Sequence, residues 1–200
     1  MAERPTTHKV RLWDPLLRGF HWLLAVFVVA AWLLGKYGPS GNMTLHFWAG
    51  YMVTFLLAFR LVWGFVGPPP ARFSHFLRGP GTVAGYARHM FMREPSYWPG
   101  HNPLGALSVI AMLALLAAQV LTGMMSEAEN FVDVGPLASY VSAATRSSAR
   151  SFHFFGADLL LIFVLLHVGV ILFYRFWKRE DLIGPMVHGR KEVRDDLTKP

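Results

Sequence analysis

Four long apolar stretches constrain the fold of this chain more than any other feature of its sequence. They cover about residues 16–34, 45–65, 104–124 and 152–177. A helix of roughly 20 apolar residues crosses the hydrocarbon core of a bilayer, which is about 30 Å thick. None of the stretches alternates with period two, and lipid offers no partner to an open strand edge. The sequence therefore predicts an all-α integral membrane protein with a four-transmembrane-helix bundle.

The composition agrees with a membrane protein and disagrees with a soluble one. Of the 200 residues, 54% are apolar and only 16% are charged, whereas a soluble domain carries about 25% charged residues. So few charged side chains cannot cover a water-facing surface. We expect a single membrane domain over residues 1–200, surrounded by lipid as a multi-pass protein. Its long loops are residues 66–103 and 125–151.

The distribution of basic residues predicts the orientation. Most of the 19 lysines and arginines precede or begin the first stretch, lie in the 66–103 loop, or end and follow the fourth stretch. The opposite side carries only Lys36, Arg146 and Arg150. By the positive-inside rule, both termini and the 66–103 loop are cytoplasmic. The net charge of +7 then reflects topology, and nucleic acid is not an expected partner.

Histidines inside the apolar stretches are the strongest functional signal. The chain has no cysteine, which excludes disulfides, thiolate metal sites and covalently attached c-type haem. Of its nine histidines, four fall within the predicted spans: His21, His46, His153 and His167. An ionisable side chain in hydrocarbon is costly, and it marks a functional site by default. A single histidine could instead serve helix packing, so the argument rests on all four together.

The predicted topology places the four histidines at two depths. His153 and His167 are fourteen residues apart, which in a helix separates them by about 21 Å along nearly one face. His46 enters its span from the outer side, at the depth of His153. His21 enters from the cytoplasm, at the depth of His167. This arrangement of two pairs suits two haem groups, each held between imidazoles of facing helices.

Other metal and proton chemistry fits this pattern less well. A zinc site gathers three or four ligands at one depth. A proton relay usually needs interleaved carboxylates, and Asp158 is the only acidic residue well inside a span. Met124 and Met125 are candidate axial ligands in principle, although packing explains them more simply. Two non-covalent haem b groups with bis-histidine ligation are therefore the expected cofactors.

Arg60 is a further candidate for cofactor binding. It lies fourteen residues from His46, near the cytoplasmic end of the second span and at the expected depth of the His21–His167 pair. A guanidinium there could pair with a haem propionate, or it could extend to the lipid headgroups. The sequence leaves both readings open.

The chain resembles the bacterial cytochrome b561 and nickel–iron-hydrogenase b-type cytochrome superfamily over nearly its whole length. The resemblance is carried by RLWDPLLRGFHWLL around His21, LHFWAGYMVTFLLAFRLVWGFVG around His46, HNPLGALSV at the third span, and FHFFGADLLLIFVLLHVGVILFYRF with His153 and His167. It implies a diheme, four-helix protein that carries electrons between the outer face and the quinone pool. It also implies that His21 and His167 hold the cytoplasmic-side haem, and that His46 and His153 hold the outer one.

The resemblance implies two candidate functions. Many members work with a periplasmic partner, either a c-type cytochrome or a dehydrogenase such as hydrogenase. A compact branch acts alone as a superoxide oxidase that reduces ubiquinone. A superoxide site needs a cationic funnel, but the outer loops balance three basic residues against Glu127, Glu129 and Asp133. The electron-transfer module is therefore the preferred reading. A haem-free transporter would need more intramembrane polar groups than the histidines leave.

Overall fold

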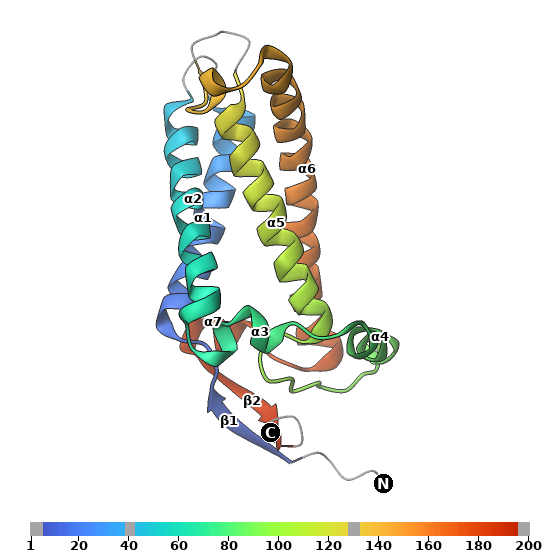
Figure 1. Cartoon of the computed structure of the whole chain (residues 1–200). Helices are drawn as coiled ribbons and strands as arrows, with labels where there is room; N and C mark the ends of the chain where they lie inside the picture. The colour runs from blue at the N-terminus through green and yellow to red at the C-terminus, as the bar shows by residue number, and fades with distance from the viewer. Residues whose placement is uncertain (1–5, 39–42, 128–132, 196–200) are drawn as a thin grey trace. The chain divides into compact units, whose positions relative to one another are not determined.

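Four long helices dominate the computed structural model, which describes residues 6–38, 43–127 and 133–195 (Figure 1). Each of the four is long and apolar enough to cross a membrane. This confirms the prediction of a mostly helical, multi-pass membrane protein. The four helices are α1 (Pro15–Tyr37), α2 (Thr44–Val66), α5 (Pro103–Met125) and α6 (Ala143–Phe173), the last continuing into a π-helical turn, η3 (Tyr174–Lys178).

Short elements connect and flank these helices. The segment between α2 and α5, predicted as a cytoplasmic loop, contains three helical pieces, and the chain carries a short strand near each end. The short elements are β1 (Thr7–Arg11), η1 (Pro69–Ala71), α3 (Phe73–Phe76), α4 (Pro80–His89), η2 (Ala138–Tyr140), α7 (Ile183–His188) and β2 (Arg190–Arg194).

Polar side chains fix where three of the long helices begin. Asp14 Oδ1 accepts hydrogen bonds from the N–H groups of Leu16 and Leu17, both 3.0 Å. Asn102 Oδ1 does the same for Gly105 at the start of α5 (2.7 Å), and Ser142 Oγ does so for Thr145 at the start of α6 (3.1 Å). Such caps satisfy N–H groups that have no partner within the helix.

The helix α6 begins well before the apolar stretch that predicted it. Its first residue is Ala143, whereas the predicted span begins at residue 152. The intervening sequence, AATRSSARS, is polar, so hydropathy cannot detect it. Its alanines and arginines favour a helix nonetheless, and the helix continues through them.

The chain divides into two compact units, and each long helix contributes residues to both. Unit 1 comprises Met1–Phe20, Arg60–Ile110 and Leu165–Pro200, and unit 2 comprises His21–Phe59 and Ala111–Val164. The organisation of residues 1–200 as a single membrane domain stays a prediction.

Unit 2 packs segments of all four long helices around one apolar cluster. Its buried centre is Val53 and Leu57 of α2, Leu116 of α5 and Leu160 of α6. Residues of α1, among them Phe27, pack against this centre. On the outside of both units, many large apolar side chains of the helices are exposed. Such helices are suited to lipid, which acts as their solvent.

Unit 1 joins the two ends of the chain in a small antiparallel ribbon. The strand β1 pairs with β2, with Thr7 opposite Arg194 and Arg11 opposite Arg190. Val193 of β2 is completely buried. The segments next to the two termini therefore lie side by side. The cytoplasmic placement of the termini stays a prediction.

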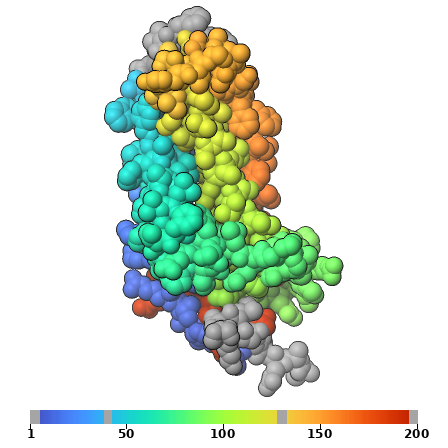
Figure 2. All heavy atoms as spheres, viewed as in Figure 1, coloured from blue at the N-terminus to red at the C-terminus, as the bar shows by residue number. Residues whose placement is uncertain are grey.

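The helix α4 is the most exposed helix of unit 1. None of its residues is buried, and Figure 2 shows it standing out from its neighbours in green. A hydrogen bond still anchors it, because the hydroxyl of Tyr86 on α4 bonds to the hydroxyl of the buried Tyr174 (2.6 Å between the two Oη atoms). Burial raises the pKa of Tyr86 above its usual value, so this phenol stays protonated at neutral pH.

Candidate functional site

Two of the four predicted histidines meet within unit 2. His46 near the start of α2 and His153 of α6 have ring centroids 6.0 Å apart, with the ring planes at 89°. Both side chains are half-buried. Residues more than a hundred positions apart in sequence are thus brought together at one site.

A backbone carbonyl holds each of these imidazoles. His46 Nδ1 donates to Ala31 O of α1 (2.8 Å), and His153 Nδ1 donates to Gln119 O of α5 (2.9 Å). A carbonyl oxygen can only accept, so in the neutral ring Nδ1 carries the proton and Nε2 carries the lone pair. A backbone carbonyl on one ring nitrogen is the usual support for a histidine that binds a metal through the other.

Glycines make room for both rings. A Cβ atom at Gly35 would lie 3.0 Å from His46 Cε1, and a Cβ at Gly123 would lie 2.8 Å from His153 Cε1. Each ring thus occupies space that only glycine leaves. By contrast, a Cβ at Gly50 would meet no atom within 4 Å, although Gly50 lines the same cavity.

A largely apolar cavity of about 260 Å³ opens beside the two rings. We call it the histidine cavity, and His46 and His153 line it together with Gly35, Gly50 and Gly123. Its other lining residues include Val28, Trp32, Phe47, Val53, Thr54, Leu116, Gln119, Met124, Phe154, Ala157 and Leu160. Five charged residues also line it: Lys36, Glu127, Asp133, Arg150 and Asp158.

The two imidazoles of His46 and His153 suit a metal ion whose other ligands come from a cofactor. A metal–imidazole bond is about 2 Å long, so one ion between two imidazoles puts their centroids roughly 6 Å apart. The observed separation of His46 and His153 is 6.0 Å. Within residues 6–38, 43–127 and 133–195, no three His, Asp or Glu side chains gather as one metal site. Two imidazoles beside an apolar cavity are what a haem requires, since the porphyrin supplies four nitrogens.

The other two predicted histidines belong to different units. His21 lies on α1 in unit 2, where its ring contacts that of Trp22 edge-to-face (5.2 Å between centroids). His167 lies on α6 in unit 1 and is half-buried. The pairing of His21 with His167 stays a prediction.

Arg60 is buried in unit 1, with 2% of its surface exposed. Its guanidinium carbon lies 4.6 Å from the ring centroid of Phe73 and 5.9 Å from that of Phe76. Its Nη1 atom has no hydrogen-bond partner among the described residues. The side chain is therefore covered by aromatic rings and does not extend to solvent. Its role in binding a haem propionate stays a prediction.

Ion pairs engage Arg146 and Lys36, which the sequence predicts to lie on the outer side. Arg146 Nε lies 2.8 Å from Glu127 Oε2. Lys36 Nζ lies 3.7 Å from Asp158 Oδ1. Arg150 lines the histidine cavity. Much of the positive charge on this side is thus balanced by carboxylates.

The sequence did not predict the residues that support the histidines. Ala31 contributes only a backbone carbonyl, and Gly35 contributes only the absence of a side chain, so neither has a recognisable pattern. Gln119 had a detectable signal, because it is a strongly polar residue within an apolar span. Its side-chain amide donates to His153 O (2.8 Å).

The fold and the site together define a class of protein: a multi-pass membrane protein with paired histidines beside an apolar cavity. The family described as prokaryotic cytochrome b561 matches residues 12–189. The chain therefore belongs to the prokaryotic cytochrome b561 and Ni/Fe-hydrogenase B-type cytochrome family, as its sequence predicted.

Individual relatives are distant but similar in length. A probable Ni/Fe-hydrogenase B-type cytochrome subunit from Bradyrhizobium diazoefficiens is 26% identical over 96% of this chain and 88% of its own. The probable Ni/Fe-hydrogenase 1 B-type cytochrome subunit of Escherichia coli K12 is 26% identical over 90% of this chain and 86% of its own. No solved structure matches the chain.

Proposed function

We propose that this chain is a diheme b-type cytochrome of the bacterial inner membrane. It carries electrons between a redox partner at the outer face and the quinone pool. The observation that carries the proposal is the pair His46–His153, whose rings are 6.0 Å apart beside an apolar cavity. The family contributes the cofactor, because b-type cytochromes bind haem b.

Four histidines would hold the two haems. His46 and His153 bind the outer haem through Nε2, since Ala31 and Gln119 hold each Nδ1. His21 and His167 bind the second haem, on the cytoplasmic side. Haem b, when bound, supplies a one-electron iron couple whose potential depends on its ligands, its burial and nearby charge. The protein orients the imidazoles and excludes water from them.

The buried charge of Arg60 supports its proposed role beside the second haem. A guanidinium covered by Phe73 and Phe76, with an unsatisfied Nη1, is costly unless an anion lies nearby. Asp14 is one such anion, because its carboxylate interacts electrostatically with Arg60, and a haem propionate at Nη1 would be a second.

A Ni/Fe hydrogenase is the proposed electron donor. The relatives from Bradyrhizobium diazoefficiens and Escherichia coli bear the name of hydrogenase cytochrome subunits, and they match this chain over nearly its full length. A periplasmic c-type cytochrome or another dehydrogenase would fill the same role.

The outer charges favour an electron-transfer module over an enzyme acting alone on superoxide. Superoxide is an anion, and its capture depends on a positive surface potential. Carboxylates neutralise Arg146 and Lys36, which weakens such a potential. Superoxide oxidation is therefore the alternative function that the experiment below distinguishes from electron transfer.

Spectra and partner-dependent reduction test the proposal. The reduced-minus-oxidised spectrum of the purified chain, with haem extraction, is expected to give two haem b per chain. In native membranes, adding H2 is expected to reduce these haems. Absence of haem b would contradict the proposal. Rapid superoxide consumption with a soluble quinone, without reduction by H2, would replace the module by the stand-alone oxidase.

A further inference from the structure

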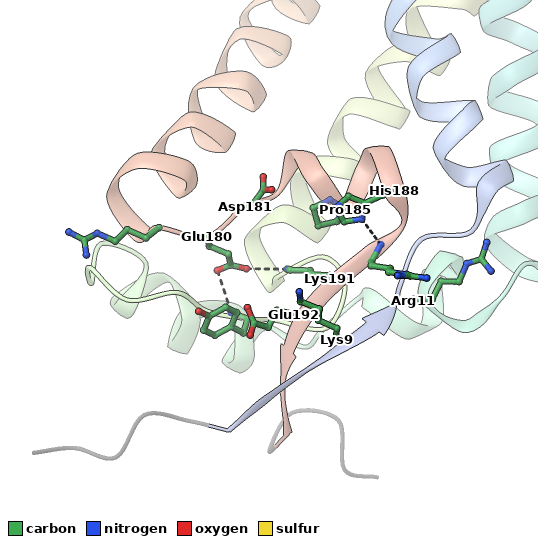
Figure 3. A pocket seen from close by; sticks show the side chains of 11 residues that line it. Lys9, Arg11, Glu180, Asp181, Pro185, His188, Lys191 and Glu192 are labelled. Atoms are coloured by element: carbon green, nitrogen blue, oxygen red, sulfur yellow. Dashed lines mark hydrogen bonds and ion pairs between the residues drawn. The ribbon is translucent and has the colours of Figure 1, made fainter.

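A second cavity, in unit 1, is lined almost entirely by charged and polar residues. It has a volume of about 700 Å³ and lies beside the β1–β2 ribbon, the segment that follows α6, and α7 (Figure 3). We call it the ribbon pocket. Its lining residues are Lys9, Arg11, Tyr97, Arg179, Glu180, Asp181, Pro185, His188, Arg190, Lys191 and Glu192.

The carboxylates of the ribbon pocket already have partners. Glu180 forms a buried ion pair with Lys191 (3.1 Å), drawn as a dashed line in Figure 3. The same carboxylate accepts hydrogen bonds from the N–H and hydroxyl groups of Ser96 (2.7 and 2.8 Å).

The other two carboxylates are engaged as well. Asp181 pairs with Arg175, which lies outside the pocket lining (3.0 Å). Glu192 accepts a hydrogen bond from Thr7 Oγ1 (2.9 Å). Cations therefore already balance Glu180 and Asp181, and only Glu192, whose partner is a neutral hydroxyl, keeps a negative charge without an ion pair among the described residues.

Four cations of the pocket have no ion pair among the described residues. They are Lys9, Arg11, Arg179 and Arg190, and all four are exposed. Lys191 is different, because it is buried against Glu180 and also donates to Trp98 O (2.9 Å). The accessible charge of the pocket is thus predominantly positive.

The register of the ribbon concentrates this positive charge. Arg11 of β1 lies directly opposite Arg190 of β2, and Lys9 lies opposite Glu192. Opposite residues of an antiparallel pair project from the same face, and like charges in that position destabilise the pair. An anion between Arg11 and Arg190 would remove this repulsion.

We propose that the ribbon pocket binds a phosphate group between Arg11 and Arg190, with Lys9 beside them. Arginine is well suited to phosphate, because its planar guanidinium donates two parallel hydrogen bonds. Arg179 directly follows Lys178, the last residue of the candidate membrane-spanning helix, so an anionic phospholipid headgroup can reach the pocket. Basic pockets at membrane-helix ends bind such headgroups. A soluble phosphate compound would use the same contacts.

Binding measurements on the full chain in detergent test this proposal and distinguish the two sources. The probes are dioctanoyl phosphatidylglycerol, dioctanoyl phosphatidylcholine and inorganic phosphate, followed by native mass spectrometry and calorimetry. We expect phosphatidylglycerol to bind and phosphatidylcholine not to bind. If inorganic phosphate displaces phosphatidylglycerol at similar concentrations, the natural ligand is soluble phosphate; if it does not, the ligand is the lipid.

Substitutions locate the site. Arg190→Gln is expected to weaken binding about fivefold, and Arg11→Gln with Arg190→Gln about 30-fold. The matched control removes two exposed cations outside the pocket, Arg78→Gln with Arg88→Gln, and should leave binding unchanged.

Arg190→Glu separates binding from stability. It places opposite charges across the ribbon, which favours strand pairing, yet it should abolish anion binding. Circular dichroism checks that each variant is folded. The proposal is overturned if no phosphate probe binds, if the control variant loses as much affinity as the pocket variant, or if Arg190→Glu binds like the unaltered chain.

Discussion

The histidine cavity and the ribbon pocket hold their polar groups in opposite ways. In the histidine cavity, two imidazoles project from apolar helices, and backbone carbonyls fix them. In the ribbon pocket, charged side chains from two short strands surround a larger space. The first environment penalises unbalanced charge and suits an iron ion whose charge the porphyrin dianion largely balances. The second tolerates charge and suits a hydrated anion.

The difference shows that the surroundings of a polar group determine which ligand it can bind. His46 and Arg11 are both basic residues near the end of an element. His46 lies within a membrane-spanning helix, and its Nδ1 is held by a backbone carbonyl, so Nε2 is the nitrogen that can bind a metal. Arg11 lies on an exposed strand, where its charge persists and attracts anions.

The largest expected effect concerns the room for a histidine ring. Gly123→Ala places a Cβ 2.8 Å from His153 Cε1, and the ring cannot move without losing its bond to Gln119 O. We expect loss of about half of the bound haem, measured by extraction. Gly85→Ala is the control, because a Cβ there meets nothing within 4 Å. Full haem content in Gly123→Ala would show that the ring position is not critical.

The next effect concerns the buried ion pair of the ribbon pocket. Glu180→Gln leaves the charge of Lys191 buried without its carboxylate. Breaking such a pair costs about 3 kcal/mol, and denaturant unfolding followed by tryptophan fluorescence should report it. The comparable change at the exposed Glu192, Glu192→Gln, should cost less than about 0.5 kcal/mol. Equal losses of unfolding free energy in the two variants would mean that the Glu180–Lys191 ion pair adds no stability of its own.

A smaller effect is expected at Arg60. Arg60→Met keeps an unbranched side chain against Phe73 but removes the positive charge. We expect the midpoint potential of one haem to fall by the equivalent of about 1 kcal/mol, while the other stays unchanged. Redox titration monitored by absorbance measures both. If neither midpoint moves, Arg60 does not act on a haem.

The smallest effect is a pH dependence at Asp181. Partial burial raises its pKa, but hydrogen bonds from the Gly184 and Ile183 N–H groups and the charge of Arg175 outweigh it, so the net pKa is lowered. The ionised Asp181 carboxylate stabilises the fold at any pH above the usual carboxyl pKa of about 3.9. This stabilisation is lost as the pH falls through the lowered pKa of the folded state. Asp181→Asn should therefore unfold at a slightly lower temperature than the unaltered chain at pH 7. The difference should disappear in acid, and a difference that grew in acid would contradict this assignment.

The sequence predicted the four membrane helices because long apolar stretches have few alternative structures. The early start of α6 at Ala143 escaped detection because a helix can continue beyond hydrocarbon. The sequence did not predict the β1–β2 ribbon, for a different reason. Thr7 and Arg194 pair across nearly the whole chain, and no local pattern specifies such a contact.

Candidate site residues were predictable from the sequence where a polar or ionisable side chain lies in an apolar stretch. His46 and His153 stand out because ionisable groups are rare in apolar spans. Arg11 and Arg190 do not, because basic residues flanking a membrane helix are expected from topology alone. The supports of the histidines, such as Gly35, act through backbone and empty space. These features become visible only when the helices are placed together.

The most direct test of the account is the haem content of three chains purified in parallel. The unaltered chain is expected to hold two haem b, and His153→Ala is expected to hold one. His89→Ala, which changes an exposed histidine of α4, is expected to hold two. If His153→Ala retains as much haem as the unaltered chain, then the meeting of His46 and His153 is not a haem site.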